Sequence, residues 1–155
     1  VGDYSSMMNE IERMRQSQGA KLVAVSAKPS DGLILRAVDV AATFDDRQLA
    51  SFQRFAPYIV EAELGRTAVT DNSLEILSHF THLRSLHLEN TLVSGRSLDK
   101  LAGLAELRYL NLSGTKVTNE SLRSLKKMVN LRNIYLFNTP AEPVASAAQV
   151  NRSSQ

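Results

Sequence analysis

The sequence of 155 residues contains no cysteine. Disulfide bonds, thiolate metal sites, covalent haem attachment and cysteine nucleophiles are therefore excluded within it, and the redox environment stays undecided. No apolar run approaches the roughly 20 residues that a membrane-spanning helix needs, so no such helix is predicted. The chain begins with Val1 and shows no apolar signal segment, and we expect it to be a piece of a longer protein.

The composition is that of a folded domain. An apolar content of 43% is ordinary for a globular protein, and the length suits one domain. The net charge of +2 is unevenly spread, because residues 31–82 carry four basic and eight acidic side chains, whereas residues 83–139 carry nine basic and four acidic ones. This distribution indicates a polarised molecule rather than a nucleic-acid-binding protein.

A hexapeptide with apolar residues at its first, fourth and sixth positions recurs every 24 residues, and a threonine follows at the ninth position. The copies begin at Leu35, Ile59, Leu83, Leu107 and Leu131, and the threonines are Thr43, Thr67, Thr91, Thr115 and Thr139. The pattern L-x-x-L-x-L-x-x-T is typical of leucine-rich repeats, with threonine where asparagine or cysteine often stands. We expect the threonine hydroxyls to hydrogen-bond loop backbone inside the stack, from turn to turn.

The second half of each unit carries apolar residues three positions apart, as in Leu74, Leu77 and Phe80. This spacing predicts a helix after each strand. Because strands pack about 4.8 Å apart and helices about 8–10 Å apart, stacked units must curve with the strands inside. The predicted fold is a right-handed α/β solenoid, with a parallel sheet on its concave side and helices on its convex side. The expected helix N-caps are Thr70, Ser94 and Thr118.

The repeat pattern also predicts the domain organisation. Residues 35–139 are expected to form a solenoid of about five units. Residues 1–34 are expected to form an N-terminal cap, with a helix that ends at Gly19 and a strand over residues 21–26. Residues 140–155 are expected to be a disordered tail.

The segment G-T-K-V-T-N-E-S-L over residues 114–122 resembles a unit frequent in bacterial leucine-rich-repeat proteins. Residues 33–137 are further similar to the C-terminal repeat module of bacterial c-type cytochrome-domain proteins of the planctomycete and Bacteroidetes type. The similarity includes G-L-I-L-R-A-V-D-V over residues 32–40 and Y-L-F-N-T over residues 135–139. It implies an extracytoplasmic location, periplasmic or in the cell envelope, and a role as an interaction module. Any haem domain would lie outside this sequence.

Side-chain alternation places the third, fifth and seventh positions of each copy on the concave face. One end of that face is expected to be acidic and the other aromatic and rich in amides. Tyrosine and asparagine on a rigid sheet suit protein or glycan recognition, and an ordinary solvated face is the alternative. The candidate binding residues are Asp39, Glu61, Glu63, His87, Glu89, Tyr109, Asn111, Asn133, Tyr135 and Phe137.

His87 falls between Glu63 and Asn111 in one expected row. A carboxylate–imidazole cluster could bind a metal or act as a general base. We interpret His87 as a surface histidine instead, because the sequence has no nucleophile–base pair, no glycine-rich phosphate loop and no H-E-x-x-H motif. No catalytic residue, metal site or cofactor is predicted.

The sequence therefore predicts a non-catalytic module that binds an unknown protein or glycan through its concave face, without a nucleic-acid partner. A structural spacer that orients an adjacent cytochrome or other redox domain is the alternative. Lys126 and Lys127 make the last helix basic, which we interpret as solvated surface, with anionic lipid or an acidic partner as the alternative. The last strand, at residues 131–137, leaves an open edge and allows an edge-strand dimer.

Overall fold

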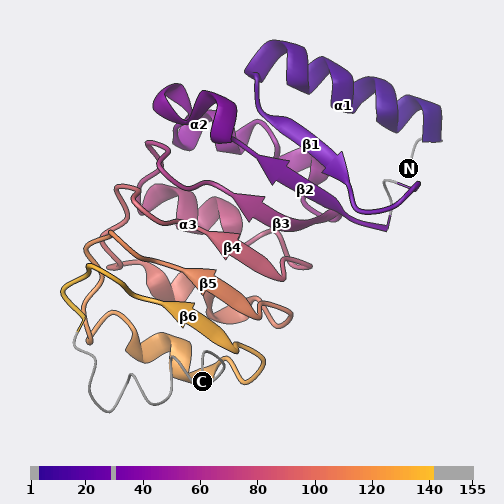
Figure 1. Cartoon of the computed structure of the whole chain (residues 1–155). Coiled ribbons are helices and arrows are strands. Elements are labelled where there is room, and N and C mark those ends of the chain that lie inside the picture. Colours follow the sequence, from indigo (N-terminus) through magenta and orange to yellow (C-terminus); the bar gives the residue numbers. More distant parts are fainter. Residues whose placement is uncertain (1–3, 29–30, 142–155) are drawn as a thin grey trace.

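The structure is a computed structural model that describes residues 4–28 and 31–141. Its strands form one six-stranded sheet, in which β1 to β6 follow one another in chain order (Figure 1). β1 pairs antiparallel with β2, and all later neighbours pair in parallel. The strands are β1 (Lys21–Ala24), β2 (Leu33–Arg36), β3 (Ile59–Glu63), β4 (Ser85–His87), β5 (Tyr109–Asn111) and β6 (Asn133–Tyr135).

Helical segments connect the parallel strands and lie on one side of the sheet (Figure 1). From β3 onward each unit is a strand, a turn and a helical segment, repeated at 24 residues. The chain therefore has an α/β leucine-rich-repeat fold with a mostly parallel sheet. The segments are η2 (Val38–Thr43), α2 (Asp46–Ala50), η3 (Gln53–Phe55), α3 (Asn72–Leu77), η4 (Leu98–Gly103) and η5 (Arg123–Lys127).

η4 and η5 are 3-10 helices, whereas α3 is an α-helix. A 3-10 helix has three residues per turn, so side chains three positions apart lie on one face. Leu98, Leu101 and Leu104 follow this spacing and are all buried. The spacing thus predicted the buried face correctly, but it did not distinguish the two kinds of helix.

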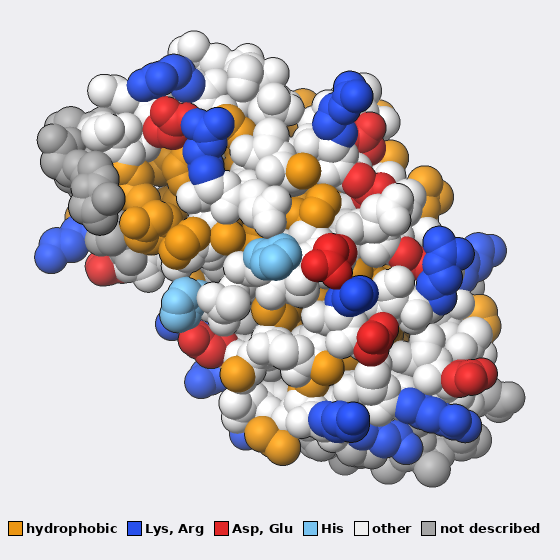
Figure 2. All heavy atoms as spheres, turned by 180° about the vertical axis from the view of Figure 1, so that it is seen from behind, with side chains coloured by type: hydrophobic (Ala, Val, Ile, Leu, Met, Phe, Trp, Pro, Cys, Tyr) orange, Lys and Arg blue, Asp and Glu red, His pale blue; other side chains and the backbone are white. Residues whose placement is uncertain are grey.

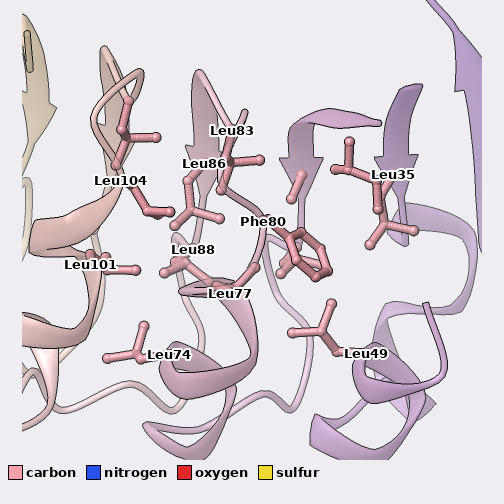
Figure 3. Close-up of a cluster of buried hydrophobic side chains, with 14 of the residues drawn as sticks. Leu35, Leu49, Leu74, Leu77, Phe80, Leu83, Leu86, Leu88, Leu101 and Leu104 are labelled. Atoms are coloured by element: carbon pink, nitrogen blue, oxygen red, sulfur yellow. The ribbon is translucent and has the colours of Figure 1, made fainter. Parts of the chain in front are cut away.

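The core is a layer of leucines between the sheet and the helices. Leu64, Leu88 and Leu112 occupy the same place in successive units and are fully buried. Figure 3 shows Leu88 beside Leu77 of α3 in this layer. Leu136, the fourth member of the column, is only partly buried, because it lies at the end of the stack. Each unit therefore shelters the apolar side chains of the next, as the repeat pattern predicted.

The repeated threonines hydrogen-bond loop backbone inside their own unit. The hydroxyls of Thr67, Thr91 and Thr115 donate to the carbonyls three residues earlier at 2.7, 2.7 and 2.6 Å, and all three side chains are buried. Thr139 makes this bond at 2.8 Å, and the exposed Thr43 makes it at 3.3 Å. The predicted hydrogen bond to loop backbone is confirmed, although it does not reach the neighbouring unit.

α1 (Tyr4–Gln18) lies along β1 at the first edge of the sheet (Figure 1). Its side chains Ile11 and Met14 are buried in the core. The helix ends before Gly19, which has φ +78°, and a Cβ there would lie 2.6 Å from Cγ1 of Val40. The predicted helix end is confirmed, whereas the strand after it stops at Ala24, earlier than expected.

The first copy of the repeat is placed differently from the prediction. A strand beginning at Leu35 would bring Asp39 into the row of Glu63. Instead Arg36 of β2 is the register partner of Glu63, an offset of 27 residues rather than 24. The physical reason is the antiparallel pairing of β2 with β1, in which Leu33 and Leu35 both face the core and are fully buried.

Asp39 is consequently not a residue of the sheet face. It lies in η2, exposed, and its carboxylate is 3.0 Å from Nζ of Lys21. No strand in the described part of the chain pairs with the far edge of β6, and an edge-strand dimer there stays a prediction.

The predicted N-caps are confirmed only in part. The residues directly before α3, η4 and η5 are Asp71, Ser97 and Leu122, and none caps through its side chain. The Thr70 hydroxyl accepts the backbone N–H of Asn72 at 3.1 Å, and it also donates to Asp46 Oδ2 at 2.6 Å, one unit earlier. Ser94 bonds Asp71 in the same way.

Thr118 makes no such link, because Gly95 stands where the next carboxylate would be. Its backbone N–H donates to Ser121 Oγ at 2.8 Å within the same unit, and its hydroxyl accepts the N–H of Ser121 at 3.3 Å, a reciprocal pair like a capping box that agrees with the predicted cap. The threonine or serine ahead of each helical segment therefore joins units only where the preceding unit supplies an aspartate.

Candidate binding surface

The face of the sheet that points away from the helices, here called the sheet face, carries two rows of aligned side chains. The register from β3 to β6 fixes them, because aligned residues of parallel strands point to the same side. This arrangement agrees with the predicted alternation for every copy after the first. The rows are Glu61, Ser85, Tyr109 and Asn133, and Glu63, His87, Asn111 and Tyr135.

Backbone hydrogen bonds continue this alignment beyond the strands. The backbone N–H of Asn90 donates to Ser113 O at 2.8 Å, and that of Gly114 donates to Phe137 O at the same distance. Glu89, Ser113 and Phe137 therefore follow the ends of β4, β5 and β6 in the order expected for the seventh position.

Four rings on the sheet face form a continuous series of contacts, tilted between the first three and stacked between the last two, here called the aromatic ladder: His87, Tyr109, Tyr135 and Phe137. Successive ring centroids are 4.7, 5.2 and 6.3 Å apart. These separations are typical of interacting aromatic pairs. Tyr109 is the diagonal neighbour of both His87 and Tyr135 across the strands, which brings their rings together although they stand in different rows.

The two amide side chains near the ladder are partly engaged. Asn133 Nδ2 donates to Tyr135 Oη at 3.3 Å. Asn111 Oδ1 accepts a hydrogen bond from the backbone N–H of Ser113 at 3.0 Å. Asn111 therefore helps to shape the turn after β5, while Asn133 orients the hydroxyl of the ladder.

Glu61, Glu63 and Glu89, here called the acidic cluster, lie at the β3–β4 end of the sheet face. Glu63 Oε1 is 3.2 Å from Arg36 Nε, and Glu61 Oε2 is 3.3 Å from His87 Nε2. Sequence reasoning missed Arg36, because it placed the first strand in the wrong register. Leu33 and Leu35 are buried, whereas Ile34 and Arg36 between and after them are only partly buried. This alternation in the sequence could have placed Arg36 on the sheet face.

Burial raises the pKa of Glu61, and the adjacent carboxylate of Glu63 raises it further, while His87 acts in the opposite direction. Burial also raises the pKa of the Tyr109 hydroxyl, with smaller contributions in the same direction from Tyr135, Glu89 and Glu61. The phenol therefore lies within electrostatic reach of the acidic cluster.

Glu89 is held close to the backbone of the preceding unit. A Cβ at position 65 would lie 2.6 Å from Glu89 Oε2, so Gly65 leaves the space that this carboxylate occupies. The other oxygen, Oε1, is buried and accepts no hydrogen bond from the described residues. Glu89 thus adds a carboxylate, with no cationic partner among the described residues, at the border of the acidic cluster and the aromatic ladder.

The expected row neighbours His87 and Glu63 do not pair with each other. Glu63 pairs with Arg36, and His87 pairs with Glu61. Within residues 4–28 and 31–141, no three histidine, aspartate or glutamate side chains are grouped so that they could hold a metal ion.

The helix side of the molecule carries charges of both signs (Figure 2). Glu75 lies 3.6 Å from His79 Nε2 and 3.2 Å from Lys100 Nζ, and Glu106 lies 2.9 Å from His82 Nδ1. Lysine and arginine side chains gather toward the C-terminal end of this face (Figure 2). Among the described helices, none has the length and apolar character needed to cross a membrane.

No family model matches the sequence, and no curated protein matches it. Among solved structures, the chain is similar to an internalin (inlF) of Listeria monocytogenes, with 18% identity and a TM-score of 0.44. That match covers 61% of this chain but only 31% of the internalin chain. A second internalin of this organism, internalin C2 (inlC2), matches with 16% identity and a TM-score of 0.46, over 90% of this chain and 78% of that chain. These comparisons give no support to the resemblance to cytochrome-domain proteins, and the assignment to the leucine-rich-repeat fold rests on the repeat geometry described above.

Proposed function

We propose that the chain is a non-catalytic protein-interaction module that binds its partner through the sheet face. The aromatic ladder is the observation that carries this proposal. Other large aromatic side chains, such as Phe44 and Phe80, are fully buried, whereas Phe137 is 72% exposed at the end of the ladder. A contiguous exposed apolar surface marks an interaction site in soluble proteins, and tyrosine is enriched among the residues that dominate binding energy.

The central ring of the ladder is held in place by its surroundings. Tyr109 is half-buried, contacts His87 and Tyr135 on its two sides, and stands on a strand paired on both sides. Ordering flexible side chains opposes association, so aromatic rings that are already fixed contribute contact area at a small entropic cost.

We propose further that the module belongs to a larger extracytoplasmic protein. This part of the proposal is supported by the resemblance of residues 33–137 to the cytochrome-associated repeat module. The alternative role, a spacer that orients a neighbouring redox domain, makes no use of the sheet face, and a glycan ligand would use the same face as a protein.

The test places the photo-cross-linking residue benzoylphenylalanine at Phe137 or, as a matched control, at Val129. Both side chains are highly exposed, at 72% and 77%, but Val129 lies after η5, away from the ladder. We expect irradiation in an extract of the source organism to give a discrete protein adduct from position 137 and none from position 129.

The adduct should disappear when Tyr109→Ala and Tyr135→Ala are added. A spacer predicts no discrete adduct from either position. Equal adducts from both positions, or an adduct that survives loss of both tyrosines, would contradict binding through the sheet face.

A further inference from the structure

We infer that the partner presents one extended segment that crosses the strands of the sheet, with a lysine or arginine on the acidic cluster and an apolar side chain on the aromatic ladder. This inference rests on the proposed function and adds the chemistry of the partner. The two halves of the sheet face, acidic over β3 and β4 and aromatic over β5 and β6, carry it.

The acidic half of the sheet face has more negative charge than its own cations balance. Arg36 pairs with Glu63, and His87 reaches Glu61. Glu89 has no cationic partner among the described residues, and its buried Oε1 accepts no hydrogen bond. Glu89 therefore adds negative charge that no described cation balances, and a cationic group of a partner at this surface would complement it.

The position of Tyr109 favours arginine in particular. Its ring adjoins the ring of His87, with centroids 4.7 Å apart, and His87 Nε2 lies 3.3 Å from Glu61 Oε2, so the ladder and the acidic cluster meet here. A planar guanidinium group can donate to a carboxylate while its stem and edge contact neighbouring rings, which a lysine ammonium does less well.

The spacing of the strands sets the spacing of the two anchors. β3 to β6 are consecutive neighbours in the sheet (Figure 1). The acidic cluster lies over β3 and β4, so two to three steps of about 4.8 Å separate it from β6, a distance of about 10–14 Å. An extended chain advances about 3.3 Å per residue, so the cation and the apolar anchor should stand about three to four residues apart.

The experiment selects binders from a displayed library of random decapeptides on the immobilised full chain, at low and at high salt. Selected peptides are then titrated against three variants. Glu61→Gln with Glu89→Gln removes charge from the acidic cluster and preserves side-chain shape. Tyr109→Ala with Tyr135→Ala removes the ladder, and Glu120→Gln with Asp99→Asn is the matched control on the helix side. Circular dichroism and Tm verify that each variant is folded.

We expect selected peptides to share a lysine or arginine and an aromatic or aliphatic residue about three to four positions apart. Their Kd should rise at least tenfold with the glutamine pair and with the alanine pair, and stay within twofold in the control. Added salt should weaken peptide binding to the wild-type chain. It should have little effect on the residual binding to the variant with Glu61→Gln and Glu89→Gln.

Two other outcomes would contradict the inference, and they differ in what they leave standing. Peptides without a basic residue that depend on both tyrosines would overturn the inference and leave the proposed function intact. Failure to enrich any peptide, or enrichment that is unaffected by loss of both tyrosines, would overturn the inference and count against the proposed function as well.

Discussion

Asp71 and Ser94 lie 23 residues apart in the sequence and are joined by two hydrogen bonds. Asp71 Oδ1 accepts the backbone N–H of Ser94 at 2.9 Å, and Oδ2 accepts its hydroxyl. Oδ1 also accepts the N–H of Gly95 at 3.2 Å, and Arg96 Nε lies 3.5 Å from Oδ2. Asp46 makes the equivalent link to Thr70. Aspartates on the helix side therefore tie successive units together.

Asp71→Ala should lower the free energy of unfolding by about 2–4 kcal/mol, because several donors in a buried site lose their acceptor together. Asp71→Asn keeps one acceptor oxygen and should cost less. Urea denaturation measures both, with the exposed Asp99→Ala as control. A loss for Asp71→Ala no larger than that of the control would show that the inter-unit bonds contribute nothing measurable.

Thr91→Val should lower the free energy of unfolding by about 1–2 kcal/mol, because the change preserves shape but removes the hydroxyl that donates to Leu88 O in a buried turn. Thr43→Val, at the equivalent exposed position with a bond of 3.3 Å, should cost less than about 0.5 kcal/mol. Thermal denaturation of the two variants checks this, and equal losses would refute the burial argument.

Gly114→Ala should destabilise the fold by more than about 1 kcal/mol. Gly114 has φ +73°, and a Cβ there would collide with the side chain of Asn90. At Gly103 an added Cβ would meet no atom within 4 Å, so Gly103→Ala should be neutral or stabilise by up to about 1 kcal/mol. Chemical denaturation measures the free energy of unfolding of both variants. A larger loss for Gly103→Ala than for Gly114→Ala would be inconsistent with the described turn.

Glu61→Gln should raise Tm at neutral pH. The pKa of Glu61 is higher in the folded chain than in the unfolded chain, so the folded protein holds the proton more tightly and is destabilised when Glu61 is charged. This destabilisation is absent well below the pKa that Glu61 has in the unfolded chain, and it is complete above the pKa that Glu61 has in the folded chain. The Tm difference between variant and wild type should therefore vanish by about pH 3.

Thermal scans from about pH 3 to pH 8, with Glu120→Gln as control, measure this effect. A lower Tm for Glu61→Gln at neutral pH would mean that the contact with His87 outweighs the cost of burying the carboxylate.

The sequence predicted much of this structure because one physical constraint repeats. A 24-residue unit cannot bury Leu88 or Leu112 without its neighbours, so the apolar pattern determines the stack and, through strand alternation, the sheet face. The same reasoning failed at the first unit. There pairing with β1 determines the register, and an antiparallel partner from outside the repeats leaves no trace in a 24-residue period.

The contacts on the sheet face were predictable only in part. Alternation placed Tyr109 and Tyr135 on one surface, but the diagonal contact between them depends on side-chain rotamers. The pairing of Glu63 with Arg36 depends on the register of β2. The second role of Thr70 was not predictable from the repeat alone, since its hydroxyl donates to Asp46, 24 residues earlier, while it accepts the N–H of Asn72.

The most direct test of binding through the sheet face is the Kd of the protein cross-linked from Phe137, measured by titration calorimetry below the Tm of every variant. Two interfacial tyrosines should together account for at least about 2.7 kcal/mol, so Tyr109→Ala with Tyr135→Ala should weaken Kd by about 100-fold or more. Val129→Ala should leave Kd within about twofold. A Kd unchanged by loss of both tyrosines, or weakened only by Val129→Ala, would contradict the account.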